Sequence, residues 1–299
     1  MIETFLLIHF NRTPILPRRT VVIGGGGFVG GAVVAGLKAK EARVVSVARS
    51  HVDLLASNAA EELAGLLQPG DAVVVAAAKA PCKDMSMLID NMLMSKAILD
   101  AFAKAELSHL INISSDAVYP DEPVPLNETV PPSPATFHGV MHLAREIGFT
   151  SEIKVPLAIL RLTLVYGAND PHNGYGPNRF LRHASSGKDI ILFGEGEERR
   201  DHVWIEDVAE LVFRVLAYRS RGILNIATGS VYSFRRIAEK AIEFNRNKVS
   251  LVSQPRQSPQ PHNGYRPFDT AALRSAFPDF TFTALFEGMA KVHGNMTSV

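Results

Sequence analysis

Residues 21–31, "VVIGGGGFVGG", contain the pattern that decides the fold. A short apolar run ends in four glycines, and a helix-forming stretch starts at Phe28. Gly24, Gly27 and Gly30 follow a G-x-x-G-x-x-G spacing between this predicted strand and helix. The first two glycines permit a tight turn and a close approach of the backbone to a phosphate, and the third permits close packing of the helix on the sheet. The stretch therefore predicts a dinucleotide-binding turn, and a plain tight turn is the alternative.

Strands and helices continue to alternate along the chain after this turn. The apolar runs "ARVVSVA", "DAVVVAAA", "HLINIS" and "LAILRL" are separated by helical patterns, including long ones over 84–105 and 136–148. Asn58 ahead of Glu61 predicts a capping box at the start of a shorter helix. Strands that are apolar throughout indicate a parallel sheet covered on both faces, and right-handed crossovers then give a doubly wound α/β architecture.

The composition changes after Gly167, where Gly, Pro and Asn become dense and the predicted elements become shorter. We interpret this part as a smaller C-terminal substrate lobe over the carboxyl ends of the strands. The predicted division is an N-terminal extension at 1–18, a nucleotide-binding domain at 19–166 with 203–229, and the substrate lobe at 167–202 with 230–299.

One short pattern occurs twice in the predicted lobe. "PHNGYGP" at 171–177 recurs as "PHNGYRP" at 261–267. Turns select Asn, Gly and Pro strongly, so two turn-rich loops resemble each other by chance. The alternative is that both loops line one polar pocket.

The composition limits the class of protein. At 299 residues and 46% hydrophobic, the chain is long enough for one large domain or two coupled domains. Lysine plus arginine number 31 against 30 for aspartate plus glutamate, so we expect no nucleic-acid or membrane partner. The single cysteine, Cys82, excludes an internal disulfide and fits a reducing compartment. No run approaches the roughly 20 apolar residues of a membrane helix, and "FLLI" ahead of His9 is too short for a signal peptide, so we expect a cytoplasmic protein.

The end of the second predicted strand bears on the choice of cofactor. NAD-selective sites place a carboxylate there for the ribose 2′-hydroxyl, whereas an arginine accommodates a 2′-phosphate. Arg49 and Ser50 follow this strand, and no acid precedes Asp53. The sequence therefore favours NADP over NAD, and an Arg49 that is merely solvated is the alternative.

Several further motifs establish a family resemblance that runs from Thr20 to about Val292. They are "DAVVVAAAKAP" with Asn91 downstream, "LINISSDAVYP", "LRLTLVYGANDP", "GKDIILFGEGEERRDHVWIEDVAELV" and "ILNIATGSVYSFRRIAE". With these motifs the chain resembles an extended short-chain dehydrogenase/reductase of the nucleotide-sugar epimerase, dehydratase and reductase group. The resemblance implies a Rossmann domain, a nucleotide-sugar substrate and a homodimer, and Arg49 favours NADP as the cofactor.

The resemblance also implies roles for individual residues. Ser115, in S-x-x-V-Y, matches the serine that activates the substrate. Substrate contacts are expected at Arg200, Arg266 and Asn178. Cofactor contacts are expected at Gly24, Gly27, Phe28, Val29, Gly30, Arg49, Ser50, Asp53, Leu54, Ala76, Ala77, Ala78, Lys79, Asn91 and Ser114.

The chain departs from the family at the catalytic helix. The family pattern is Tyr-x-x-x-Lys, and the stretch "HGVMHLARE" places His138 and His142 at those positions. Both histidines lie on one helix face. An unperturbed imidazole, with a pKa of about 6.5, donates a proton near neutrality without help from a lysine. Two such histidines also bind zinc in some proteins, but no third ligand is evident and we expect no metal.

These observations leave two functional hypotheses. The first is an NADP-dependent oxidoreductase or epimerase that acts on a nucleotide-activated sugar by hydride transfer, with an atypical active site. In this enzyme Ser115, His138 and His142 would be the catalytic residues. The second is a catalytically silent nucleotide-binding protein that serves as a sensor or scaffold, because a fold does not guarantee its usual function.

Overall fold

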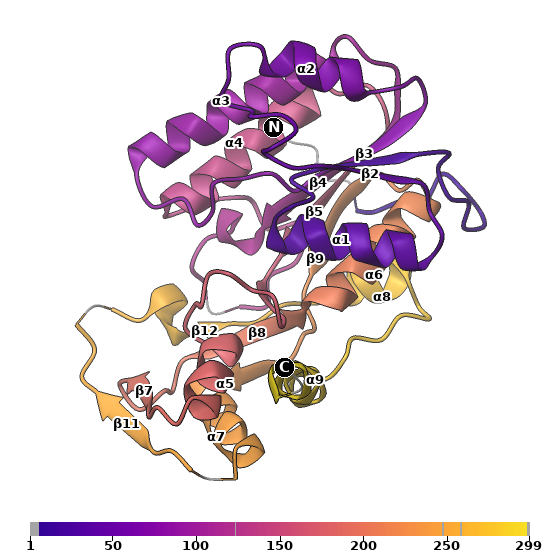
Figure 1. Cartoon of the computed structure of the whole chain (residues 1–299). Coiled ribbons are helices and arrows are strands. Elements are labelled where there is room, and N and C mark those ends of the chain that lie inside the picture. Colours follow the sequence, from indigo (N-terminus) through magenta and orange to yellow (C-terminus); the bar gives the residue numbers. More distant parts are fainter. Residues whose placement is uncertain (1–5, 123, 247, 258, 298–299) are drawn as a thin grey trace.

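The computed structural model describes residues 6–122, 124–246, 248–257 and 259–297. Its larger part is a six-stranded parallel sheet in the order β2-β1-β3-β4-β5-β9 (Figure 1). The strands are β1 (Thr20–Ile23), β2 (Val44–Val47), β3 (Asp71–Val75), β4 (Leu107–Ser115), β5 (Leu157–Leu162) and β9 (Gly222–Ile226). The predicted α/β architecture with a parallel sheet and a smaller C-terminal lobe is confirmed.

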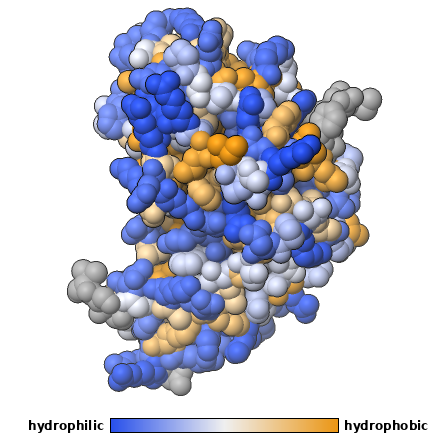
Figure 2. All heavy atoms as spheres, turned by 90° about the vertical axis from the view of Figure 1, so that its right-hand side faces the viewer, coloured by the Kyte–Doolittle hydropathy of each residue, from blue (hydrophilic) through white to orange (hydrophobic). Residues whose placement is uncertain are grey.

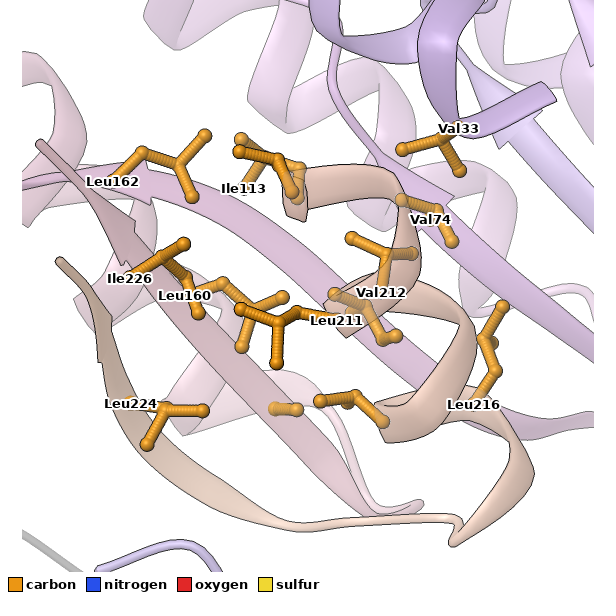
Figure 3. Packing of buried hydrophobic residues seen from close by; sticks show 14 of the residues in the cluster. Val33, Val74, Ile113, Leu160, Leu162, Leu211, Val212, Leu216, Leu224 and Ile226 are labelled. Carbon is orange, nitrogen blue, oxygen red and sulfur yellow. The ribbon is translucent and has the colours of Figure 1, made fainter. Parts of the chain in front are cut away.

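Helices cover both faces of this sheet (Figure 1). One face carries α1 (Phe28–Ala39) and α6 (Ile205–Ala217), and the other carries α2 (Ala59–Leu66), α3 (Met85–Phe102) and α4 (Phe137–Glu152). Each face of the sheet forms an apolar core with its helices. Figure 3 shows the core on the α1 and α6 face, where Leu211, Val212 and Leu216 of α6 lie against the strands. Both faces of β3 are buried, which explains why its sequence is apolar without alternation.

The strand order places a crevice at the carboxyl ends of β1 and β3. The chain passes from β1 to β2 on one side and then returns to β3 on the other side, so the order reverses between these neighbours. Ligands of open α/β sheets bind at such a switch point. Gly24 directly follows β1 and Ala76 directly follows β3, so both flank the crevice.

The smaller part is built around a four-stranded sheet. In it β8 (Arg199–Trp204) pairs with β10 (Val231–Ser233), β12 (Tyr265–Arg266) and β6 (Leu164–Tyr166). The strands β7 (Ile190–Phe193) and β11 (Leu251–Gln254) form a separate pair. A separate apolar core joins α5 (Pro177–Ser185), α7 (Phe234–Phe244) and α9 (Leu285–Thr297). The remaining elements are the 3-10 helices η1 (Asp116–Val118) and η2 (Pro261–Gly264) and the short helix α8 (Ala271–Ala276).

Two segments pack against the larger part of the molecule, although the predicted domain boundaries placed them outside it. Leu273 of α8 and Phe277 belong to the core of the larger part, because α8 packs beside β9. Ile8 exchanges backbone hydrogen bonds of 2.9 Å in both directions with Arg221, so the described part of the N-terminal extension lines the edge of the main sheet. Residues 1–5 of that extension lie outside the described residues. The sequence did not predict the place of α8, because an apolar side chain does not specify which of two cores it joins. It did not predict the place of Ile8, because backbone hydrogen bonds leave no signal in the sequence.

None of the described helices is both long and apolar enough to cross a membrane. Figure 2 shows the side of the molecule that lies to the right in Figure 1, where hydrophilic side chains separate several small apolar patches.

Candidate active site

The glycine turn forms the floor of a cleft of about 500 Å³ at the switch point. Gly24 has a φ of +86°, and a Cβ atom there would lie 2.5 Å from the backbone nitrogen of Ala77. A Cβ atom on Gly30 would lie 2.1 Å from the carbonyl oxygen of Gly24. Gly27 is the N-cap residue of α1 and provides no side-chain hydrogen bond to the amide groups of the first helical turn. Such amides bind phosphate, and the turn therefore fits a dinucleotide.

Most of the predicted cofactor residues come together in this cleft. Those that line it are Gly24, Gly27, Arg49, Ser50, Asp53, Leu54, Ala76, Ala77, Ala78 and Lys79. Phe28 lines a different cleft, between α1 and α6, while Val29 and Gly30 lie within α1. Met94 of α3 lines the cofactor cleft without having been predicted, because a methionine in a helix looks like any core residue.

Arg49 lies at the rim of the cleft and is not free. Its Nη2 forms an ion pair of 3.0 Å with Oδ2 of Asp53, and its side chain is 78% exposed. A hydrogen bond from the Leu55 amide, and then Arg49, lowers the pKa of the Asp53 carboxyl. Arg49 and Asp53, both predicted as cofactor contacts, therefore form an ion pair with each other at this rim.

Asn91 organises the far wall of the cleft from α3. Its Oδ1 accepts a 2.9 Å hydrogen bond from the Lys79 amide, and its Nδ2 donates one of 3.1 Å to the Lys79 carbonyl oxygen. The Lys79 ammonium pairs with Asp90 at 2.5 Å. Asn91 thus holds the strand exit in place and does not line the cleft itself.

Ser114 belongs to a buried network behind the cleft. Its hydroxyl donates a 2.5 Å hydrogen bond to Glu146 of α4, whose carboxylate also binds Arg161 at 2.7 and 3.1 Å. Ser114 is 2% exposed. Its side chain therefore faces α4, which differs from the predicted contact with a cofactor.

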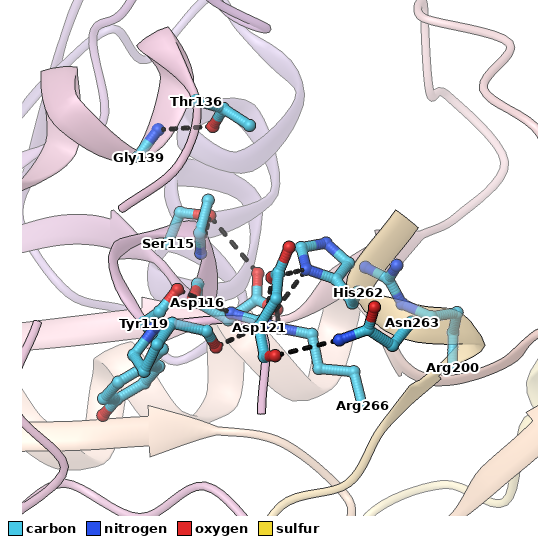
Figure 4. A network of polar contacts seen from close by, with 12 residues as sticks. Ser115, Asp116, Tyr119, Asp121, Thr136, Gly139, Arg200, His262, Asn263 and Arg266 are labelled. Carbon is cyan, nitrogen blue, oxygen red and sulfur yellow. Dashed lines mark hydrogen bonds and ion pairs between the residues drawn. The ribbon is translucent and has the colours of Figure 1, made fainter. Parts of the chain in front are cut away.

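Ser115 ends β4 and starts η1. Its Oγ accepts a 3.1 Å hydrogen bond from the Ala117 amide and lies 3.4 Å from Oδ1 of Asp116. The start of α4 packs directly on this turn, since a Cβ atom on Gly139 would lie 2.1 Å from the Ala117 carbonyl oxygen. Thr136 caps α4 by accepting a 3.1 Å hydrogen bond from the Gly139 amide (Figure 4). This close approach brings His138 next to the Ser115 segment.

His138 and His142 face each other on α4, with ring centroids 4.7 Å apart at 86°. His138 Nδ1 accepts a 3.4 Å hydrogen bond from the Cys82 amide, which leaves Nε2 for a substrate. Burial lowers the pKa of His138, although Asp116 raises it. Burial, followed by Arg145, holds the pKa of His142 well below its ordinary value. The pKa of both imidazoles therefore lies below the ordinary value that the sequence argument used as its reference.

Arg200 and Arg266 lie opposite each other on the neighbouring strands β8 and β12. Both side chains are buried (Figure 4). Arg266 Nε donates to Asp116 at 2.8 Å and Nη1 to Asp121 at 3.1 Å, so carboxylates already engage this guanidinium. Within the described residues Arg200 has a single ion pair, of 3.2 Å with Glu198. Arg200 is therefore the arginine with more donors left for a substrate.

Asn178 has a different role in the structure from the predicted substrate contact. Its Nδ2 donates to Asp170 at 2.8 Å, and its Oδ1 accepts from the Gly167 amide at 3.3 Å. The amide group therefore ties the start of α5 to the preceding loop.

The acidic groups beside Ser115 were not predicted. Asp116 connects Ser115 to Arg266, while Asp121 contacts Arg266 and the Nδ1 atom of His262 (Figure 4). The position of Asp116 directly after the predicted Ser115 was the feature of the sequence that could have indicated this acidic group. Among the described residues, no group of three His, Cys, Asp or Glu side chains is arranged to hold a metal ion.

Comparison with known proteins identifies the family. Residues 20–227 match the NAD dependent epimerase/dehydratase family. The chain belongs to this family. ADP-L-glycero-D-manno-heptose-6-epimerase of Thiobacillus denitrificans is 24% identical over 320 residues, which covers 91% of this chain and 96% of that protein. A shorter match, 28% over 112 residues, covers 36% of this chain and 35% of UDP-N-acetyl-alpha-D-glucosaminuronate decarboxylase of Bacillus cytotoxicus.

Solved structures share the fold over nearly the whole chain. UDP-N-acetylglucosamine 4-epimerase of Bacillus cereus is 25% identical with a TM-score of 0.80, covering 94% of this chain and 97% of that one. UDP-glucose 4-epimerase of Thermus thermophilus, solved in complex with NAD, is 21% identical with a TM-score of 0.79 and covers 94% and 99%. The resemblance inferred from the motifs is thereby confirmed at the level of the family and the fold.

Proposed function

We propose that the protein is an NADP-dependent oxidoreductase or epimerase that acts on a nucleotide-activated sugar. The observation that carries the proposal is the packing of Gly139 on Ala117, because it sets the histidine face of α4 against the Ser115 turn. Arg145 of the same helix donates a hydrogen bond to Ala77, which lines the dinucleotide cleft. Family membership supports the substrate class, since the similar proteins are named for nucleotide sugars.

The residues divide the chemistry among them. A bound nicotinamide would supply or accept the hydride at one sugar carbon. Ser115 hydrogen-bonds the oxygen on that carbon, and His138 transfers the proton at the same oxygen through Nε2. His142 hydrogen-bonds a ribose hydroxyl of the cofactor. Arg200 contacts the diphosphate of the sugar nucleotide, a role for which a planar guanidinium is suited.

The choice of NADP rests on Arg49 at the rim of the cleft. Its guanidinium is exposed and lies beside the place where a 2′-phosphate would bind. Asp53, which pairs with Arg49, offers the carboxylate that an NAD ribose requires, so NAD is the second candidate.

A catalytically silent nucleotide-binding protein is the alternative function. The absence of Tyr and Lys from positions 138 and 142 and the burial of His142 favour it. Turnover of a sugar nucleotide separates the two functions.

We further propose that the protein forms a homodimer through α3 and α4. Met85, Ile89 and Leu93 follow a four-residue spacing on α3 and are 56, 53 and 52% exposed. Val140 and Ile147 of the neighbouring helix α4 are 38 and 49% exposed. Apolar side chains gathered on an adjacent helix pair are typical of a surface that a second copy covers.

Calorimetry tests the substrate class. Wild type is titrated with UDP-, ADP-, GDP- and dTDP-sugars in the presence of NADPH. We expect at least one to bind, and Arg200→Lys to weaken that binding about tenfold or more, because a point charge does not reproduce a bidentate fork. NADPH binding serves as the control for folding and should be unchanged in this variant. Failure of all these sugars to bind wild type would remove the nucleotide-sugar assignment.

A further inference from the structure

Arg145 lies on the same face of α4 as the two histidines. Positions 138, 142 and 145 are spaced i, i+4 and i+7, which places them in one row along a helix. Arg145 is 3% exposed and is the last member of the row. Neither the family match nor the mechanism proposed above assigns it a role.

The Arg145 guanidinium reaches the end of the sheet beneath the cofactor cleft. Its Nη1 donates a 2.9 Å hydrogen bond to the carbonyl oxygen of Ala77, a residue that lines the cleft. Its Nη2 donates to the carbonyl oxygen of Ile113 in β4 and lies 3.5 Å from Nδ1 of His142. One side chain therefore connects α4, the exit of β3 and the second histidine.

This buried cation has no carboxylate of its own. No ion pair involving Arg145 occurs within the part of the chain that the structure describes, and its Nε has no hydrogen-bond partner there. The adjacent Glu146 binds Arg161 and Ser114 instead. A charge in the interior is costly when the neighbouring carboxylate binds other groups, and burial accordingly lowers the pKa of Arg145 although Glu146 raises it.

We propose that Arg145 is a positioning residue that supplies the fixed positive charge beside the nicotinamide end of the cleft, in place of the lysine that the family pattern has at position 142. The inference rests on the proposed function, because it assigns His138 and His142 to the reaction. Arg145 does not touch the substrate and acts through the histidines and through the Ala77 segment.

The contact with His142 also fixes how that ring is protonated. A guanidinium only donates hydrogen bonds, so Nδ1 of His142 is the acceptor and the neutral ring carries its proton on Nε2. His142 is then a hydrogen-bond donor at Nε2, as an ammonium group at this position would be. His142 and Arg145 together thus replace the two properties of a lysine, its donor and its charge.

Titration of the histidines by NMR tests this inference without any activity. The charged groups that face them are Arg145 from their own helix and Asp116 from η1. Removing the Arg145 charge in Arg145→Met should raise the pKa of His138 by about one unit, the effect typical of a nearby charge. Arg145→Lys should leave it low. Arg49→Ala, which removes a cation from the far rim of the cleft, is the matched control and should leave both histidines unchanged.

The outcomes separate this inference from the proposed function. A His138 pKa that is the same in Arg145→Met and wild type would overturn the inference, whether or not the protein turns over a sugar. A shifted pKa in a protein without turnover would support the charge role while the proposed reaction fails. If Arg145→Met does not fold, Arg145→Gln replaces it, because an amide still donates to the Ala77 carbonyl oxygen without carrying a charge.

Discussion

The surroundings of His138 determine the pH dependence that we expect. Burial lowers its pKa below 6.5, so the cation that donates a proton forms only on the acid side of the ordinary histidine range. The kcat for reduction should therefore fall as the pH rises, with a midpoint below 6.5. His138→Gln should lose about 10²- to 10⁴-fold in kcat together with this pH dependence, and should still bind NADPH. An unchanged rate in this variant would exclude His138 from proton transfer.

Arg49 carries the prediction on cofactor choice. A charge-assisted hydrogen bond to a 2′-phosphate is worth about 1.5 kcal/mol or more, which corresponds to about tenfold in affinity. We expect the lower end of this range, because Arg49 is exposed and already pairs with Asp53. Fluorescence titration of NADPH and NADH should show tighter NADPH binding in wild type and a smaller difference in Arg49→Ala. Equal affinities in wild type would contradict the prediction.

Single residues show where the sequence was a good guide to the site and where it was not. The glycine spacing located the cleft, because a missing Cβ at Gly24 has a direct steric meaning. Ser114 was predicted as a cofactor contact, yet its hydroxyl faces Glu146. The sequence does not show on which side of a doubly covered strand a small polar residue lies. The lowered pKa of His138 arises from burial by segments distant in sequence, so the spacing of the two histidines did not predict it.

At the scale of elements, the contact between α4 and η1 holds the proposed active site together. An alanine at position 139 would place its Cβ 2.1 Å from a backbone oxygen, which cannot move aside as a flexible side chain would. Gly139→Ala should therefore destabilise the protein by about 1–3 kcal/mol and displace His138 from Ser115. Urea unfolding measures the first effect and kcat the second.

Gly148 of the same helix provides the matched control for Gly139. The nearest atom to a Cβ there would be a Leu99 methyl carbon at 3.7 Å, an ordinary contact. Gly148→Ala should be neutral or stabilise the protein by about 0.5–1 kcal/mol, since alanine favours a helix interior. Equal stability of the two variants would show that the α4–η1 contact is looser than the structure indicates.

The periodicity of hydrophobic residues predicted the helices and strands. Their caps and packing partners depend on tertiary structure and could not be predicted in this way. The predicted helix over 136–148 corresponds to α4, and the predicted 84–105 to α3. The expected capping box at Asn58 does not form, since the Asn58 side chain accepts no hydrogen bond from the helix; its Nδ2 donates one of 2.7 Å to Glu62. A pattern of four residues fits either geometry, and only the folded chain selects one of them.

At the scale of the whole molecule, the apolar surface of α3 and α4 predicts a dimer. Ile89→Glu places a charge within this surface and should convert the protein to a monomer in size-exclusion chromatography with light scattering. Leu66→Glu on α2, where the side chain is 39% exposed outside that surface, is the control and should remain dimeric. A monomeric wild type would show that these side chains are exposed for another reason.

The central claim is that the protein transfers hydride to or from a nucleotide-activated sugar. The most direct measurement incubates the protein with a panel of sugar nucleotides and either NADP⁺ or NADPH deuterated at nicotinamide C4, and identifies the products by NMR and mass spectrometry. We predict either a reduced sugar that carries deuterium or an epimer of the added sugar, formed by wild type and lost in His138→Gln. Bound cofactor with no new product from any sugar nucleotide would contradict the claim and favour the silent nucleotide-binding protein.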